Sequence, residues 1–107
     1  MPGGTPEQLG RFAERQRNTT TAECAYRFFE VTRNLDVTEL LSKVNVPTLV
    51  MHKRDDQVQP FEAGRELAAG IRGARFLALP GQNHFPLAQD PETERMIEEI
   101  RLFLKPR

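Results

Sequence analysis

The chain has 107 residues, of which 38% are hydrophobic and 28% are charged, and its 15 basic side chains balance 15 acidic ones. This length fits one domain with a modest core, and the zero formal charge excludes the strongly basic surface of a nucleic-acid-binding protein. The sequence shows no run of 18 apolar residues and no basic-then-apolar leader, and a single cysteine excludes an internal disulfide. We therefore expect a soluble protein of the reducing cytoplasm, with no membrane contact.

The first 20 residues are typical of a flexible arm. Residues 1–21 are rich in Gly, Pro and Thr and carry few large apolar side chains. Such a composition cannot bury much surface, so it predicts at most one short helix, around Leu9–Arg15.

Two helices are expected next. Residues 21–33 place apolar side chains on one helical stripe, and Thr20 with Glu23 has the spacing of a capping box that would start the helix. A second box that begins at Asp36 predicts a shorter helix over residues 36–43.

From Pro47 onward the pattern changes to alternating strands and helices. Continuous apolar runs over residues 47–52 and 75–79 are typical of strands buried on both faces of a parallel sheet. Residues 61–71 and 91–104 have helical periodicity and begin beside prolines. Strand, helix, strand, helix is a right-handed parallel unit, so the sequence predicts an α/β fold.

An aspartate and a histidine follow the two predicted strands. Asp56 comes a few residues after the first strand, and His84 a similar number after the second. Functional sites of parallel sheets lie beyond the carboxyl ends of the strands, so both loops open at the same edge. A carboxylate bound to one imidazole nitrogen leaves the other free to act as a base. Asp and His are also common in solvated loops, so the spacing alone leaves both interpretations open.

Other sites are less well supported by the residues. His52 and Asp55 could join Asp56 and His84 in a metal site, since imidazole and carboxylate both bind zinc. However, His52 falls inside a predicted strand, and the spacing matches no metal-binding template. We therefore expect no metal and no cofactor, and we interpret Asp55 as a solvated turn residue.

Residues 36–104 closely resemble the C-terminal part of α/β-hydrolase fold proteins, in particular hydrolase-like domains fused to helix-turn-helix regulators or nucleotide cyclases. The resemblance rests on "VPTLVMHKRDDQVQP" and "LPGQNHFP", and residues 19–35 fit more loosely. It implies a partial α/β-hydrolase fold over residues 21–107, with Asp56 as the acid and His84 as the base of a Ser-His-Asp triad. Lys53, where a glycine is frequent, is a mild departure.

The nucleophile of that family is not found in this sequence. It belongs to a G-x-S-x-G elbow, which no segment here matches. Ser42 lies before the first strand without flanking glycines, and Cys24 falls within an amphipathic helix, where a lone cysteine is usually a small apolar residue. An Asp-His pair alone cannot carry out acyl transfer, so whether this chain is itself an enzyme stays open.

Two hypotheses follow. In the first, the chain is the C-terminal segment of an α/β-hydrolase, inactive alone, whose parent reaction is ester-type hydrolysis and which pairs with a complementing N-terminal half. In the second, it is a stand-alone binding or oligomerisation module that uses the sheet edge to form a homo-oligomer. Met1 slightly favours a genuine short product, and the substrate cannot be read from these residues.

Overall fold

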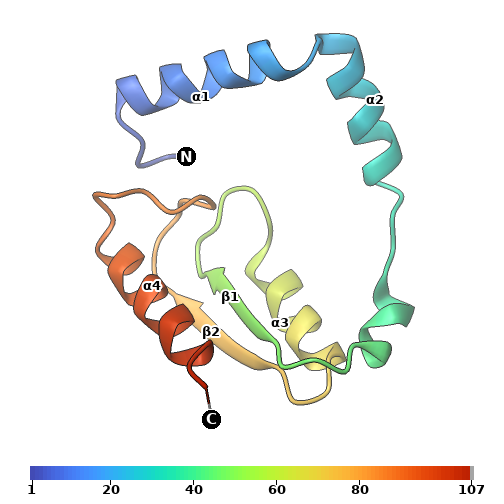
Figure 1. Ribbon diagram of the computed structural model, residues 1–107. Coiled ribbons are helices and arrows are strands. Elements are labelled where there is room, and N and C mark those ends of the chain that lie inside the picture. Colours follow the sequence, from blue (N-terminus) through green and yellow to red (C-terminus); the bar gives the residue numbers. More distant parts are fainter. Residues whose placement is uncertain (107) are drawn as a thin grey trace.

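The structure is a computed structural model that describes residues 1–106 (Figure 1). In chain order its elements are α1 (Pro6–Thr19), α2 (Ala22–Thr32), the 3-10 helix η1 (Thr38–Lys43), β1 (Leu49–Lys53), α3 (Phe61–Gly70), β2 (Arg75–Leu79) and α4 (Pro91–Phe103). The predicted α/β order is confirmed, with two parallel strands and helices at the expected places.

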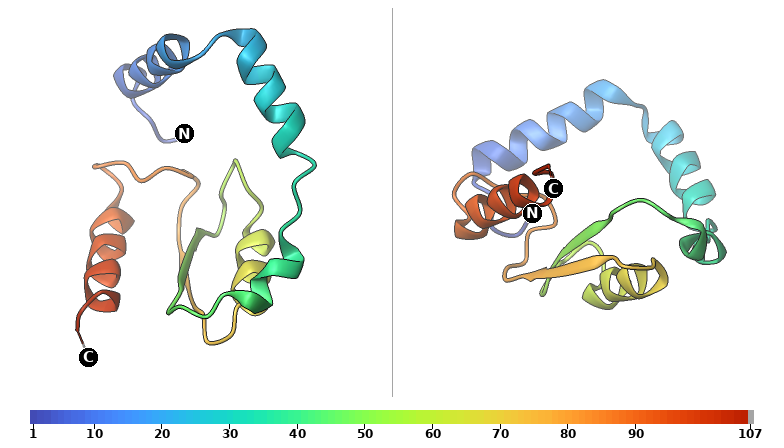
Figure 2. Two further views of the ribbon diagram at one scale, coloured as in Figure 1. Left: turned by 45° about the vertical axis from the view of Figure 1, so that its right-hand side comes forward. Right: turned by 60° about the horizontal axis from the view of Figure 1, so that its bottom comes forward.

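The two strands form a parallel pair in which Leu49 lies opposite Arg75 and Lys53 opposite Leu79. The crossover between them contains α3, which covers one face of the sheet, while α4 lies on the other (Figure 2). A parallel pair needs such a crossover because its two strands run in the same direction. Among the described residues, β1 has a strand neighbour on one side alone.

The α3 helix approaches β1 closely at a glycine. A Cβ atom on Gly64 would lie 2.5 Å from Nδ1 of His52, so this position has room for glycine alone. The same face holds Phe61 and Phe76, whose ring centroids are 5.4 Å apart. His52 therefore lies within its strand, as expected, and its side chain contacts the neighbouring helix.

The buried core is small. Its hydrophobic members within residues 1–106 are Val50, Ile71, Leu79 and Leu87, and Leu79 is the most deeply buried with 1% of its surface exposed. The polar side chains Lys53 and Asn83 are buried beside them. The core thus lies between the sheet, α3 and the loop that follows β2.

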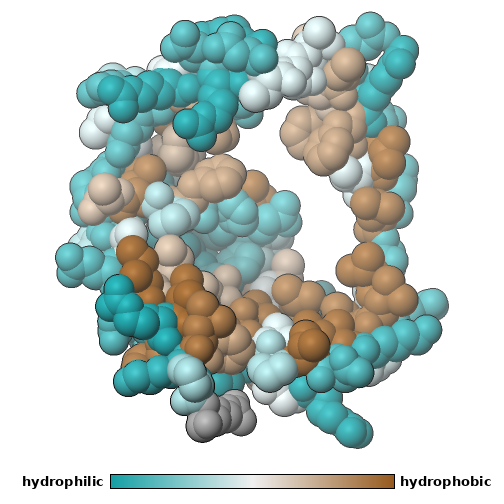
Figure 3. Space-filling model, viewed as in Figure 1, coloured by the Kyte–Doolittle hydropathy of each residue, from teal (hydrophilic) through white to brown (hydrophobic). Residues whose placement is uncertain are grey.

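Helices α1 and α2 form an arm that arches away from this body (Figure 1). No residue of either helix is buried. The arm returns to the body near the chain start, where Gly3 N–H donates to Oδ1 of Asn83 over 2.8 Å and the rings of Phe12 and Phe85 lie 5.6 Å apart. Figure 3 shows an opening between the arm and the body elsewhere.

Three local expectations need correction. Helix α1 is longer than Leu9–Arg15 because Thr5 and Gln8 form a capping box with Pro6 at the first helical position. Helix α2 is capped by Thr21, which accepts a hydrogen bond from Cys24 N–H. The expected helix at 36–43 is a 3-10 helix whose preceding Asp36 binds Thr38 rather than closing a box. Flexibility of residues 1–20 stays a prediction.

The chain is more extended than a folded monomer of its size. Its accessible surface is 8589 Å², whereas a compact 12.2 kDa protein exposes about 6,100 Å². Its radius of gyration is 16.2 Å, against about 13 Å for a compact domain of this length. About 2,500 Å² of surface is therefore exposed beyond the ordinary amount.

Candidate active site

The loops that follow β1 and β2 run side by side beyond the ends of the strands. Arg54 N–H donates to the Leu79 carbonyl over 2.8 Å, and Asp55 N–H donates to the Gly81 carbonyl over 3.1 Å. A last bond of this kind joins Gln57 N–H to the Gln82 carbonyl over 3.2 Å. This continued ladder places Asp56 and His84 next to each other at the carboxyl end of the sheet.

The two predicted residues are in direct contact. Nδ1 of His84 lies 2.7 Å from Oδ2 of Asp56. The Asp56 side chain is 3% exposed, whereas that of His84 is 35% exposed. The carboxylate is therefore enclosed by protein while the imidazole reaches the surface, which is the arrangement that an Asp-His acid and base require. Their catalytic role stays a prediction.

Asp56 is held as a carboxylate by the backbone of its own turn. Its Oδ1 accepts hydrogen bonds from Val58 N–H at 2.8 Å and Gln59 N–H at 3.0 Å. Burial raises the pKa of this carboxyl, but the bonds from Gln59, His84 and Val58, with the charge of His84, outweigh burial and lower the pKa to about 2. Asp56 is thus ionised at neutral pH.

This ionised partner determines the tautomer of His84. A carboxylate can only accept, so Nδ1 of His84 carries the proton and donates it to Asp56. When the ring is neutral, Nε2 then has a free lone pair. His84 can therefore accept a proton at Nε2 and return it, as a general base and acid.

His52 lies on the other side of Asp56, but its hydrogen bond is to a different residue. Its Nε2 lies 3.0 Å from the Gln59 carbonyl, to which it donates, and 3.5 Å from Oδ2 of Asp56. Its Nδ1 side faces Gly64 of α3. Within residues 1–106, no group of three or more His, Cys, Asp or Glu side chains has an arrangement that could hold a metal ion.

The space beside the pair is small. A cavity of about 130 Å³ adjoins Asp56 and His84 and is otherwise lined by Met51, His52, Lys53, Leu79, Pro86 and Met96. Ligand pockets usually hold about 300–1,000 Å³. The cavity is therefore too small to be a complete ligand pocket.

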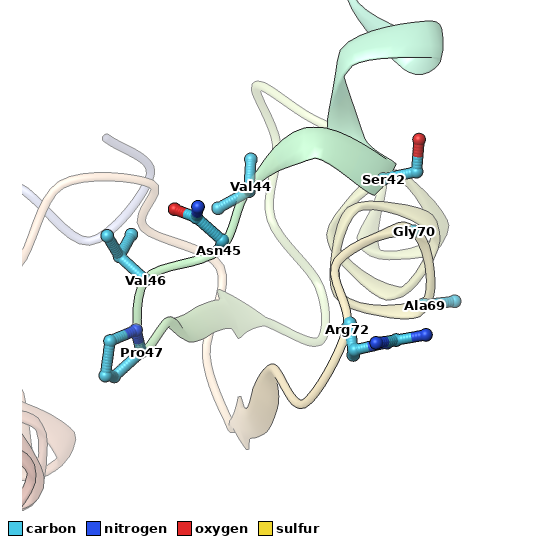
Figure 4. A pocket seen from close by; sticks show the side chains of 8 residues that line it. All are labelled: Ser42, Val44, Asn45, Val46, Pro47, Ala69, Gly70 and Arg72. Carbon is cyan, nitrogen blue, oxygen red and sulfur yellow. The ribbon is translucent and has the colours of Figure 1, made fainter.

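Neither candidate nucleophile lies near His84. Ser42 is in η1, before the amino end of β1, and it lines an open hollow of about 690 Å³ with Val44, Asn45, Val46, Pro47, Ala69, Gly70 and Arg72 (Figure 4). One five-residue strand, about 13 Å long, separates that end of the sheet from His84. Cys24 is exposed on α2.

Several residues of the site escaped sequence reasoning. The sequence analysis does not identify the N–H groups of Val58 and Gln59 as partners of Asp56. The signal for them is the tendency of an aspartate after a strand to form an Asx-type turn with the backbone that follows it. Asn83, directly before His84, is buried and bonds to Asp90. Its position between two exposed neighbours gave no sequence signal of burial.

Comparison with known proteins supports this description of the fold. The model of the TAP-like protein family matches residues 10–100. A bifunctional esterase/perhydrolase of Acinetobacter calcoaceticus is 39% identical over 59 residues, which are 54% of this chain and 21% of that protein. A non-heme haloperoxidase of Rhodococcus erythropolis is 35% identical over 71 residues, covering 65% of this chain and 26% of the relative.

A solved structure gives the same result. A thermophilic esterase from Thermogutta terrifontis, in a malate-bound form, superposes with a TM-score of 0.52 and 30% identity, over 65% of this chain and 26% of the esterase. The present chain spans between 21% and 31% of the length of the curated relatives that it matches. Because the family model covers most of the chain, the protein belongs to the TAP-like family of α/β-hydrolases.

Proposed function

We propose that this chain supplies the acid and the base of an α/β-hydrolase triad, and that the parent reaction is ester-type hydrolysis. The observation that carries this proposal is the 2.7 Å contact between Nδ1 of His84 and Oδ2 of the buried Asp56. Two similar proteins, the esterase/perhydrolase of Acinetobacter calcoaceticus and the Thermogutta terrifontis esterase, favour the same reaction class.

In this mechanism His84 acts through Nε2. It would take the proton from a serine hydroxyl as that oxygen attacks an ester carbonyl, and then pass the proton to the leaving alcohol. Asp56 would hold the ring in the required tautomer and stabilise the imidazolium that forms. Its pKa of about 2 keeps it ionised throughout the physiological range.

The serine must come from outside these 107 residues. The sequence has no G-x-S-x-G segment, and Ser42 and Cys24 lie away from His84. We therefore expect the chain alone to hydrolyse activated esters no faster than its His84→Ala variant and to resist serine-directed fluorophosphonate probes. Labelling of one defined residue by such a probe would contradict the missing nucleophile.

A chimera tests the positive part of the proposal. Residues 36–104 would replace the corresponding C-terminal segment of the Acinetobacter esterase/perhydrolase, whose remaining part supplies the other two thirds or more of the fold. We expect ester hydrolysis that falls at least about a thousandfold in Asp56→Asn and in His84→Ala. Asp55→Asn removes a neighbouring carboxylate and is the matched control; equal losses in all three variants would refute the assignment.

Self-association is a second candidate function, favoured by the excess surface. Exposed apolar side chains gather on α2 and the segment after it (Figure 3), namely Tyr26, Phe28, Phe29, Val31, Leu35, Val37 and Leu40. An obligate dimer buries about 2,000–5,000 Å² in total, and two copies that each cover an excess of about 2,500 Å² would reach that range. The unpaired edge of β1 is a further site for pairing.

The partner in this second candidate is another copy of the chain. Zero net charge gives no repulsion between copies, and two-fold pairing is the commonest form of association. Sedimentation at micromolar concentration should show a dimer or larger species, reduced to monomer by Phe29→Asp but not by Arg15→Asp, an exposed change on α1. A stable monomer, or a chain that assembles solely with the nucleophile-bearing part of a hydrolase, would refute it.

No helix within residues 1–106 combines the length and apolar character needed to cross a bilayer. Cytoplasmic localisation is part of the proposal, favoured by the lone cysteine. Fractionation of cells that express the tagged chain would test it.

A further inference from the structure

The loop that carries His84 has a gap in its backbone support. Backbone hydrogen bonds attach it to the neighbouring loop as far as Gln82, and they resume where Asp90 N–H donates to the Leu87 carbonyl. Within the described chain, the backbone between Gln82 and Leu87 has no bond of this kind to hold it. Side chains must therefore fix the position of His84.

Asn83 fills this gap. It directly precedes His84 and is 6% exposed. Its Oδ1 accepts from Gly3 N–H at 2.8 Å, and its Nδ2 donates to Oδ2 of Asp90 at 3.0 Å. A buried amide is stable when both its acceptor and its donor are used, and the opposite orientation of this amide would satisfy neither partner.

A buried charge pair supports the second of these bonds. Oδ2 of Asp90 also lies 3.7 Å from Nζ of Lys53, and the two side chains are 17% and 7% exposed. Lys53 is the last residue of β1, and Asp90 directly precedes α4. The charge pair therefore connects the end of the sheet to the start of α4, and Asn83 attaches the His84 loop to that connection.

The first bond attaches the loop to the chain start. A Cβ atom on Gly3 would lie 2.7 Å from Nδ2 of Asn83, so a larger residue at position 3 would displace this amide. Nε2 of Gln89 also donates to the Gly3 carbonyl over 3.3 Å and to Gln8 over 2.7 Å. Residues 3–8 thus hold both ends of the loop.

We propose that Asn83 is the positioning residue of His84, which it holds against Asp56 by binding Gly3 on one side and the Asp90–Lys53 pair on the other. This inference rests on the proposed function for its catalytic meaning. Its structural content, that the His84–Asp56 contact depends on Asn83, stands without it.

An isosteric change tests the dependence directly. Asn83→Asp keeps the acceptor for Gly3 but turns the donor that faces Asp90 into a second carboxylate oxygen. The measured quantity is the exchange rate with water of the His84 Nδ1 proton, followed by NMR in the ¹⁵N-labelled full chain. We expect exchange to accelerate about tenfold or more, which corresponds to the loss of one buried hydrogen bond.

A second change should partly restore the contact. Adding Asp90→Asn to Asn83→Asp again places a donor opposite an acceptor at unchanged total charge, although Lys53 loses its counter-ion at position 90. We therefore expect the exchange rate to recover part of the way from the single variant toward the original, as coupled residues do in a double-mutant cycle. Asn45→Asp, at an exposed asparagine before β1, is the matched control and should change nothing.

The outcomes separate positioning from general stability. If Asn83 merely supported the fold, the amide protons of Val50 and Leu79 would exchange faster in parallel with the His84 proton. That result, or a double variant no better than the single one, would overturn the proposal. Should Asn83→Asp fail to fold, Gly3→Ala provides the test, with about threefold faster exchange expected and Gly10→Ala as control.

Activity measurements test the proposed function, whereas the exchange measurements test the positioning role of Asn83. If Asp56→Asn and His84→Ala leave the esterase chimera unaffected, the proposed function fails while the exchange result still decides the role of Asn83. If the chimera depends on both residues, a longer chimera that carries residues 1–104, and therefore Gly3, tests Asn83. In it Asn83→Asp should lower kcat more than it changes KM, since a displaced base affects the chemical step rather than substrate binding.

Discussion

The body of this protein (β1, α3, β2 and the His84 loop) and its arm (α1 and α2) both have well-formed local structure, but they differ in how much they bury. In the body, β1, α3, β2 and the His84 loop bury apolar side chains, accommodate close glycines and satisfy buried polar groups. In the arm, α1 and α2 have good caps and an ion pair each, at Glu7–Arg11 and Glu23–Arg27, yet bury no residue. Local signals are thus sufficient to specify a helix, whereas its stability in water requires a packing partner.

The comparison also explains where the function is expected. The proposed acid and base, Asp56 and His84, are attached to the part of the chain that packs, as expected for reacting groups that must be held within a fraction of an ångström. The chain start and the first half of α1 contact the loop that carries His84, at Gly3, Gln8 and Phe12.

The largest difference is expected for apolar truncations. Leu79→Ala removes a side chain that is 1% exposed, and we expect it to lower the free energy of unfolding by about 3 kcal/mol. Phe29→Ala removes a ring that is 67% exposed, with an expected change below about 0.5 kcal/mol. Urea denaturation at submicromolar concentration measures both. A comparable loss for Phe29→Ala would mean that the arm is covered in solution.

The second largest difference is expected when one member of an ion pair is replaced. The pair with the longer contact distance should lose more stability, because it is the less exposed pair. The Lys53–Asp90 contact is longer, at 3.7 Å, than the 2.7 Å Arg27–Glu23 pair, but the latter is more than 70% exposed on both sides. Lys53→Met leaves a carboxylate buried without its counter-ion and should cost about 2 kcal/mol. Arg27→Met should cost less than about 0.5 kcal/mol. Equal effects in urea denaturation would show that Lys53 is solvated.

Replacing glycine by alanine should change stability in opposite directions in the body and in the arm. Gly64→Ala places a methyl group 2.5 Å from Nδ1 of His52, so overpacking should outweigh the gain in helix propensity and lower stability by about 1–2 kcal/mol. Gly10→Ala, with nothing within 4 Å of the new Cβ, should increase the helicity of α1, since alanine is favoured by up to about 1 kcal/mol. Circular dichroism during thermal unfolding measures both changes. Stabilisation by Gly64→Ala would mean that α3 and β1 are further apart than described.

Features that depend on local sequence signals could be predicted, whereas features that depend on contacts between distant residues could not. The strands and α3 follow from continuous apolar runs and flanking prolines, and the family resemblance identified Asp56 and His84 as candidates. The length of α1 was underestimated because the apolar content is low there, although Thr5, Pro6 and Gln8 carry a capping signal. Local signals of that kind can be read directly from the residues.

The roles of Lys53 and Asn83 depend on contacts across long stretches of sequence. Asn83 bonds to Gly3, which is 80 positions away, and Lys53 faces Asp90 from another element. Single-residue propensities contain no information on such pairs. The resemblance shows Lys53 only as a departure from the glycine that is frequent in the family. In the structure, the Lys53 ammonium lies beside the carboxylate of Asp90, which also binds Asn83.

The smallest expected effect concerns acid stability and compares Asp56 with Asp36, just after the arm. The pKa of both carboxyls is lowered, that of Asp56 to about 2 despite burial, and that of Asp36 by bonds from Thr38. A lowered folded-state pKa adds stability that is fully present above the unfolded value, about 3.9, and is lost as pH falls through the folded value. For Asp56 this window runs from about pH 4 down to about pH 2.

Asp56→Asn should therefore remove on the order of 1 kcal/mol of stability at pH 6, but have little effect near pH 2, where the native carboxyl is becoming protonated as well. Asp36→Asn changes a fully exposed group and should leave the pH dependence nearly unaltered. Urea denaturation from pH 2 to pH 6 measures both. If the Asp56→Asn curve ran parallel to the original over this range, the carboxylate would not be held by His84 and its own turn, and the geometric basis of the proposed acid and base would be lost.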